Sequence, residues 1–138
     1  MRVTVGHFEV PASDLGRAER FFCEAFGWQA VSAPWSGGDY RRLRPPAASE
    51  PGIAGGLLAA GELVDGQPLL VLHVEDATLE VCLARIRECG GVVELAPVAV
   101  GTAGRFARFR DPEGNRFGLW ERRASGAEAE ATQAPVIP

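Results

Sequence analysis

The alternation of apolar and polar residues divides the first half of the chain into strands and one amphipathic helix. Residues 2–10 alternate and are rich in β-branched side chains, so they predict a strand that Pro11 is expected to end. Ser13 or Asp14 suits the N-cap of a helix that Gly27 closes. Apolar residues recur at helical spacing between these ends, at Leu15, Ala18, Phe21, Phe22, Ala25 and Phe26. Three further strands are predicted over residues 28–33, 39–44 and 53–60.

The second half of the chain repeats this order of elements. It predicts a strand over residues 69–74, a helix over residues 77–89 closed by Gly90-Gly91, and strands over residues 92–100, 104–109 and 116–121. Each half is too small to bury its own apolar face, so the two are expected to pair their sheets around a shared cavity. The sequence therefore predicts the α+β class, with two tandem β-α-β-β-β modules over about residues 3–60 and 69–122.

Composition favours a single soluble globular domain over residues 1–123. Hydrophobic residues make up 46% of the chain and charged residues 23%, whereas residues 124–138 lack periodicity and are expected to form a disordered tail. The net charge of −4 argues against a nucleic-acid partner, and no apolar run approaches the roughly 20 residues that span a membrane. The three cysteines form no CxxC pair, so we expect free thiols and a cytoplasmic location.

Three segments carry a resemblance to a known family. The first is His7-Phe8-Glu9-Val10 with Asp14, Phe21-Phe22 and Phe26-Gly27-Trp28; the second is Val74-Glu75-Asp76 with the helix that ends at Gly90-Gly91; the third runs from Arg110 through the Asp111-Pro112-Glu113-Gly114-Asn115 turn to Leu119-Trp120. In this order and spacing the chain resembles the glyoxalase/bleomycin-resistance/extradiol dioxygenase (vicinal-oxygen-chelate) superfamily over residues 3–122. Phe22 and Phe26 depart from the Tyr and Leu usual there. The resemblance implies strongly curved mixed sheets facing each other across a cleft, and a homodimer.

The resemblance also implies where a metal would be held. Metal enzymes of this family take His, Glu or Gln ligands from the first and fourth strands of each half. His7 matches the first of these positions, but the second falls within residues 56–59, the third at Leu69 or Val71, and the fourth at Gly118. Metal sites need three or four protein ligands, so His7 is the one retained position and no standard metal site is expected. A divalent metal in a rearranged site remains an alternative.

Strand alternation places His7 and Glu9 on one face of the first strand, and Val71 and His73 on one face of the fifth. These strands are equivalent in the two modules, so His7, Glu9 and His73 are expected to approach each other in the cleft. The three side chains suit a metal site or acid–base catalysis. The alternative is a Glu9–His73 hydrogen bond that satisfies buried polar groups.

Aromatic residues complete the candidate site. Trp35 lies in a polar loop, Trp120 shares strand parity with Gly118, and Gly118 is expected to leave room in the cleft. The predicted ligand-binding residues are His7, Glu9, Trp35, Leu57, Val71, His73, Gly118 and Trp120.

The predicted function is binding of a small, partly aromatic molecule in the cleft without a metal, as antibiotic-sequestering members of the family do. Whether the chain is an enzyme stays open at this point. The alternative is a lyase, isomerase or dioxygenase with a non-standard metal site, or with an acid–base site built from His7, Glu9 and His73.

Overall fold

The computed structural model describes residues 1–33, 40–45, 52–59 and 66–123. Trp35 and the predicted tail over residues 124–138 lie outside these ranges, as do parts of the loops between the strands of the first module. No helix in the described part is long and apolar enough to cross a membrane.

The elements follow the predicted order in both halves of the chain. The first module contains β1 (Arg2–Ala12), α1 (Leu15–Phe26), β2 (Gln29–Ser32), β3 (Tyr40–Arg44) and β4 (Ala54–Ala59). The second contains β5 (Leu69–Glu75), α2 (Leu79–Glu88), β6 (Val92–Val100), β7 (Gly104–Arg110) and β8 (Arg116–Arg122). This order confirms the α+β class and the two β-α-β-β-β modules.

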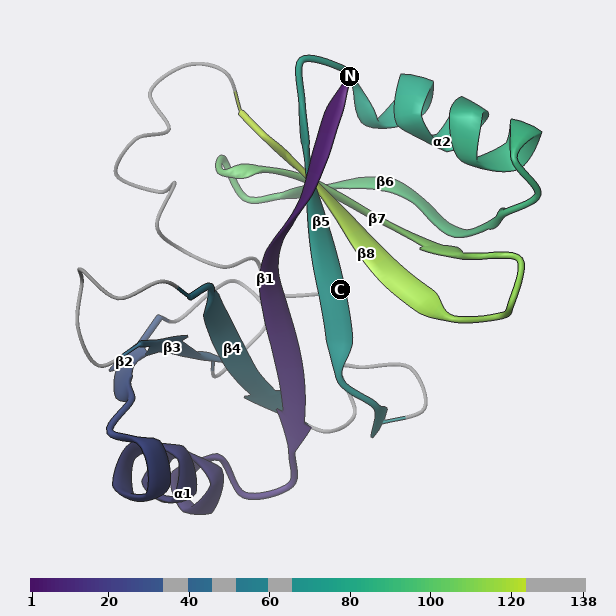
Figure 1. The fold of residues 1–138 in the computed structure, drawn as a ribbon. Coiled ribbons are helices and arrows are strands. Elements are labelled where there is room, and N and C mark those ends of the chain that lie inside the picture. Colours follow the sequence, from purple (N-terminus) through teal and green to yellow (C-terminus); the bar gives the residue numbers. More distant parts are fainter. Residues whose placement is uncertain (34–39, 46–51, 60–65, 124–138) are drawn as a thin grey trace.

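The strands form one continuous, open, eight-stranded sheet in the order β2-β3-β4-β1-β5-β8-β7-β6. Strands β1 and β4, and likewise β5 and β8, pair in parallel, whereas β1 and β5 join the modules antiparallel. The sheets expected for the two modules are therefore joined edge to edge through β1 and β5. Because β1 pairs with β5, neither strand is an open edge of its module. The backbone N–H and C=O groups on the facing sides of the two strands are thereby hydrogen-bonded. Figure 1 shows β2–β4 and β6–β8 on either side of this central pair, with α1 and α2 at opposite ends.

The sheet has an outer face, which contacts the helices, and an inner face, which does not. Leu79, Cys82 and Leu83 of α2 pack on an outer cluster that includes Leu119 and Ala107. Near α1, the Trp28 ring stacks on Phe22 at 5.3 Å and lies 6.0 Å from Phe8 of β1. The inner face carries its own buried cluster, made of Ala33, Tyr40, Leu58, Leu69, Val71, Val100, Ala103, Phe106 and Trp120.

Local signals explain the ends of the elements. Asp14 is the N-cap of α1, where its carboxylate accepts a hydrogen bond from the Arg17 amide at 3.0 Å, and Gly27 ends the helix at φ 72°. The prediction that Pro11 ends β1 is wrong. The pairing of β1 with β5 stops at Glu9, whereas the pairing with β4 continues to Ala12. Proline has no N–H to donate, and at Pro11 the side of β1 that faces β5 earlier in the strand no longer needs one.

Leu83→Ala tests the outer cluster. Leu83 is buried, and its truncation is expected to lower the free energy of unfolding by about 2–5 kcal/mol in urea denaturation. Val81 lies on the same helix and is 56% exposed, so Val81→Ala is the matched control, with an expected change of about 0.5 kcal/mol or less. Equal effects of the two substitutions would contradict the packing described.

Candidate functional site

His7 and His73 meet on the inner face through an irregularity in β1. His7 pairs with Val71 and Thr4 with His73, and the register shifts between Val5 and His7. The extra residue is Gly6, at which a Cβ would overlap the His73 ring, so a side chain here would displace the imidazole. The shift brings His7 Nδ1 to 2.9 Å from His73 Nε2.

Glu9 is fully buried beside this pair. The Tyr40 hydroxyl donates a hydrogen bond to Glu9 Oε2 at 2.6 Å, and Glu9 Oε1 lies 3.5 Å from His7 Nε2. Neither Oε1 nor Nε2 has a closer partner in the described part of the chain. The alternative of a Glu9–His73 hydrogen bond is thus not realised. Four side chains instead follow one another in the order Tyr40, Glu9, His7 and His73, and we call them the polar chain.

Burial sets the charge of every member of the polar chain. It raises the pKa of Glu9 well above its usual value and also raises the pKa of Tyr40. Burial lowers the pKa of His7 to about 3. The pKa of His73 falls to about 4, mainly through burial and then through the neighbouring His7 and Arg122. Burial therefore favours the neutral form of all four side chains.

The resemblance places the fourth-strand metal ligands within residues 56–59 and at Gly118, and aromatic side chains cover Gly56 and Gly118. Gly56 pairs with Glu9, and a Cβ at Gly56 would overlap the Tyr40 hydroxyl. Gly118 pairs with Val71, and a Cβ there would lie 2.7 Å from Phe106 Cε1. The expectation that Gly118 leaves room in the cleft is therefore corrected, because the Phe106 ring occupies that space.

Both candidates for the remaining ligand position, Leu69 and Val71, lack a metal-binding group. Val71 pairs with His7 and Leu69 pairs with Glu9. Leu69 is buried and apolar. Leu57, which was expected in the cleft, pairs with Val10 and Arg41, one residue out of phase with Glu9 and Gly56. It therefore belongs to the outer face.

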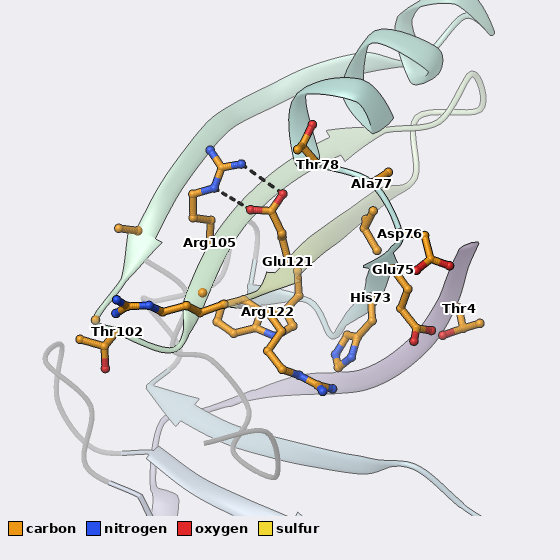
Figure 2. A pocket seen from close by; sticks show the side chains of 16 residues that line it. Thr4, His73, Glu75, Asp76, Ala77, Thr78, Thr102, Arg105, Glu121 and Arg122 are labelled. Carbon is orange, nitrogen blue, oxygen red and sulfur yellow. Dashed lines mark hydrogen bonds and ion pairs between the residues drawn. The ribbon is translucent and has the colours of Figure 1, made fainter. Parts of the chain in front are cut away.

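A pocket of about 800 Å³ opens where β5 and β8 stop pairing after His73 and Trp120. Its lining includes Thr4, His73, Ala99, Trp120 and Arg122, so two predicted ligand-binding residues lie in its wall (Figure 2). His7, Glu9, Val71 and Gly118 lie on the inner face but do not line this pocket. His73 is thus the member of the polar chain that reaches the pocket.

The charges around the pocket are partly neutralised. Arg105 pairs with Glu80 and Glu121 at 2.8 Å, as Figure 2 shows for Glu121. Glu121 also accepts a hydrogen bond from the Leu79 amide at the start of α2. Arg122 forms no ion pair or hydrogen bond with any described residue. The sequence reasoning missed the roles of Tyr40 and Arg122 because strand alternation gives the face of a residue but not its partner across the sheet.

Among the described residues, no group of three or more His, Cys, Asp and Glu side chains converges on a point that suits a metal ion. The arrangement offers one imidazole, an indole edge and three guanidinium groups in the pocket, of which that of Arg105 is paired with Glu80 and Glu121. Glu75 and Asp76 add carboxylates to the lining. These groups can hold a polar ligand by hydrogen bonds and charge, and an imidazole can also exchange a proton with a ligand.

Comparisons with known proteins agree with the resemblance. A family model described as the glyoxalase/bleomycin resistance protein/dioxygenase superfamily matches residues 4–119. No curated protein sequence matches the chain.

Solved structures share the fold at low sequence identity. A hypothetical protein from Bacillus halodurans C-125 superposes with a TM-score of 0.68 at 12% identity, covering 91% of this chain and 99% of that one. Methylmalonyl-CoA epimerase from Mycobacterium tuberculosis superposes with a TM-score of 0.63 at 19% identity, covering 86% and 87%. TnmS3, an antibiotic binding protein from Streptomyces sp. CB03234, is 28% identical over 87% and 96% of the chains, with a poor superposition at a TM-score of 0.37.

Gly118→Ala tests the filled ligand position. The added methyl group would collide with the Phe106 ring, and such overpacking is expected to lower the free energy of unfolding by about 1–3 kcal/mol. Adding Phe106→Leu should relieve the collision, so the double variant should lose less stability than the two single changes sum to. Gly16→Ala is the control, because a Cβ there meets its nearest atoms at 3.6 Å. Strict additivity in urea denaturation would contradict the contact.

The pH dependence of stability tests the neutral Glu9. Because the pKa of Glu9 is raised, the folded chain holds one proton that the unfolded chain loses near pH 4.5, and this contribution to stability declines as pH rises. The lowered pKa values of His7 and His73 make the free energy of unfolding rise with pH. This effect ends above about pH 6.5, where both histidines are neutral in the folded and in the unfolded chain. Above about pH 6.5 the wild type should therefore lose stability with rising pH while Glu9 stays protonated in the folded chain, by up to about 1.4 kcal/mol per pH unit for one proton.

Glu9→Gln is expected to remove this decline, as measured by urea denaturation across the pH series. Glu24→Gln changes an exposed carboxylate instead and should leave the wild-type profile intact. A Glu9→Gln profile that still follows the wild type would show that Glu9 is charged in the folded protein.

Proposed function

The chain belongs to the glyoxalase/bleomycin resistance protein/dioxygenase superfamily, and from that membership we propose that it binds a small, partly aromatic molecule without a metal ion. The binding site in this proposal is the pocket of about 800 Å³ at the ends of β5 and β8, next to His73 and Trp120.

The observation that carries the proposal is the filling of the ligand positions. A divalent ion needs several oxygen or nitrogen donors at one point. Of the four positions only His7 has such a donor, and the Tyr40 hydroxyl and the Phe106 ring occupy the space where side chains of Gly56 and Gly118 would begin. Glu9 adds a second donor group, but it is buried, and burial raises its pKa and so favours its neutral form. The residues present do not fit the metal that the family implies.

The pocket supports small-molecule binding by its size and its walls. Its volume lies within the range of roughly 300–1,000 Å³ that small-molecule sites occupy. Trp120, Val74 and Ala77 supply apolar surface, while His73 and Arg122 supply polar groups that can orient a ligand.

A metal-free acid–base enzyme is the second candidate. It is favoured by one observation, that His73 lines the pocket while its Nε2 contacts His7 and, through it, the buried Glu9. The metal-dependent lyase, isomerase and dioxygenase alternatives lack the donor set described above.

Homodimerisation belongs to the same proposal. Helix α1 has no buried residue, and Phe21 and Phe26 are 57% and 53% exposed although their rings contact each other at 5.8 Å. An exposed aromatic surface of this kind supports association with a second copy. Phe21→Ser together with Phe26→Ser should shift the mass measured by light scattering from dimer to monomer; a wild-type monomer would contradict this part of the proposal.

A cytoplasmic location is also part of the proposal. All three cysteines are free, which supports a reducing, cytoplasmic location.

Thermal unfolding in the presence of ligands tests the binding proposal. A set of small aromatic compounds and the divalent ions Mn²⁺, Co²⁺, Ni²⁺ and Zn²⁺ is screened against the purified chain. At least one aromatic compound is expected to raise Tm, because a ligand at 100 times its Kd stabilises a protein by about 2.7 kcal/mol. No ion is expected to do so.

Two tryptophan variants of β6 locate the site. Ala99 lines the pocket, so Ala99→Trp should fill it and abolish the shift, whereas Ala96 does not line the pocket and Ala96→Trp should retain the shift. An ion that raises Tm in the wild type but not in His7→Ala would overturn the proposal.

A further inference from the structure

We infer that the polar chain holds His73 as a hydrogen-bond donor toward the pocket, and that the ligand recognised there is a small aromatic carboxylate. The first part concerns the direction of a series of hydrogen bonds. The second rests on the proposed function and names the class of ligand that the pocket takes.

The Tyr40 hydroxyl sets the direction of the series. It is buried, and its one hydrogen bond within the described part of the chain goes to Glu9 Oε2. If Glu9 carried its proton on Oε2 and donated to Tyr40, the phenol proton would have no acceptor. A buried donor without an acceptor is costly, so Tyr40 donates and Glu9 Oε2 accepts.

Glu9 then carries its proton on the other oxygen. No cation pairs with this fully buried carboxyl among the described residues: the neighbouring His7 is neutral, and the buried Arg42 of β3, which lies opposite Gly56, forms no ion pair with it. A buried carboxylate without an ion pair takes up a proton. Glu9 Oε1 and His7 Nε2 lie 3.5 Å apart and have no other partner among the described residues, so the Oε1 proton is directed at the Nε2 lone pair. This is the longest link of the polar chain.

The two imidazoles pass the direction on. A neutral imidazole has one donor and one acceptor nitrogen. With Nε2 of His7 accepting, Nδ1 of His7 carries the proton and donates to His73 Nε2 at 2.9 Å. His73 therefore carries its own proton on Nδ1. This nitrogen has no hydrogen bond within the described residues and is not enclosed, and His73 lines the pocket.

The charges that face His73 favour an anion. Arg122 of β8 affects the His73 pKa more strongly than Glu75 of β5, and His7 of β1 is neutral. Glu75 is also paired with Arg2 at 3.4 Å, whereas Arg122 forms no ion pair among the described residues. Figure 2 shows the side chains of His73 and Arg122 on the same side of the pocket. An N–H donor beside an unpaired guanidinium matches a carboxylate, and Trp120 offers apolar surface for a planar body.

Nitrogen-15 NMR of the imidazoles tests the direction of the polar chain. The chain contains two histidines, so a preparation without a histidine tag gives one spin system for each. At pH 7 both rings are expected as the Nδ1–H tautomer in the wild type. Glu9→Gln should keep this tautomer, since its amide nitrogen can donate to His7 Nε2 while its oxygen accepts from Tyr40. Tyr40→Phe should mix the tautomers. An Nε2–H tautomer of His73 in the wild type would overturn the assignment. Loss of the Nδ1–H tautomer of His73 in Glu9→Gln would also overturn it.

Titration calorimetry tests the ligand class. Benzoate, 2-naphthoate and indole-3-carboxylate are compared with the amines and primary alcohols of the same ring systems. The carboxylates are expected to bind at least tenfold more tightly, and to lose at least tenfold in Arg122→Gln and in His73→Phe. Arg87→Gln removes an exposed arginine of α2 that does not line the pocket and should bind as the wild type does.

The outcomes separate this inference from the proposed function. If neutral or cationic aromatic compounds bind as well as the carboxylates and Ala99→Trp blocks them, the ligand class is wrong and the proposed function stands. If no aromatic compound binds at all, the proposed function and the ligand class both fail. The NMR experiment needs no ligand. It therefore determines the direction of the hydrogen bonds in the polar chain whatever the binding experiments show.

Discussion

The antiparallel pairing of β1 with β5 is the constraint on which the rest of the molecule depends. It joins two modules that could not bury their own faces, and its register decides which side chains meet on the inner face. Glu9 lies opposite Leu69 and His7 opposite Val71, while the extra residue Gly6 allows the His73 ring to reach His7. A shift of the pairing by one residue would place these side chains on the outer face.

At the centre of the sheet, packed rings take the places at which the resemblance implies metal ligands. The parallel pairs β1–β4 and β5–β8 bring Gly56 and Gly118 into equivalent places, and each glycine is covered by a ring from the next strand, Tyr40 in one module and Phe106 in the other. A metal site needs polar ligands at these places, whereas packed rings stabilise the inner face. The Tyr40 hydroxyl adds a polar end to one ring and donates a hydrogen bond to Glu9, whose pKa is raised by burial in spite of that bond.

The sequence was sufficient for the elements, their order and the family, because these depend on local periodicity, on caps such as Asp14 and Gly27, and on turn motifs such as residues 111–115. It was also sufficient to place His7, Glu9 and His73 on neighbouring strands of one face. It failed where the outcome depends on register across strands. The continuous sheet, the partner of Glu9, the face of Leu57 and the space above Gly118 follow from contacts between residues 31 or more positions apart or between paired strands, which periodicity within one strand cannot reveal.

Electron paramagnetic resonance of Mn²⁺ measures directly whether the inner face of the sheet binds a metal ion. Titrating Mn²⁺ into the chelator-free protein should give the free-ion signal in proportion to the ion added, as in buffer alone. Saturable loss of that signal at one ion per chain, restored by His7→Ala, would contradict the account, because it would require donors where Tyr40 and Phe106 now lie.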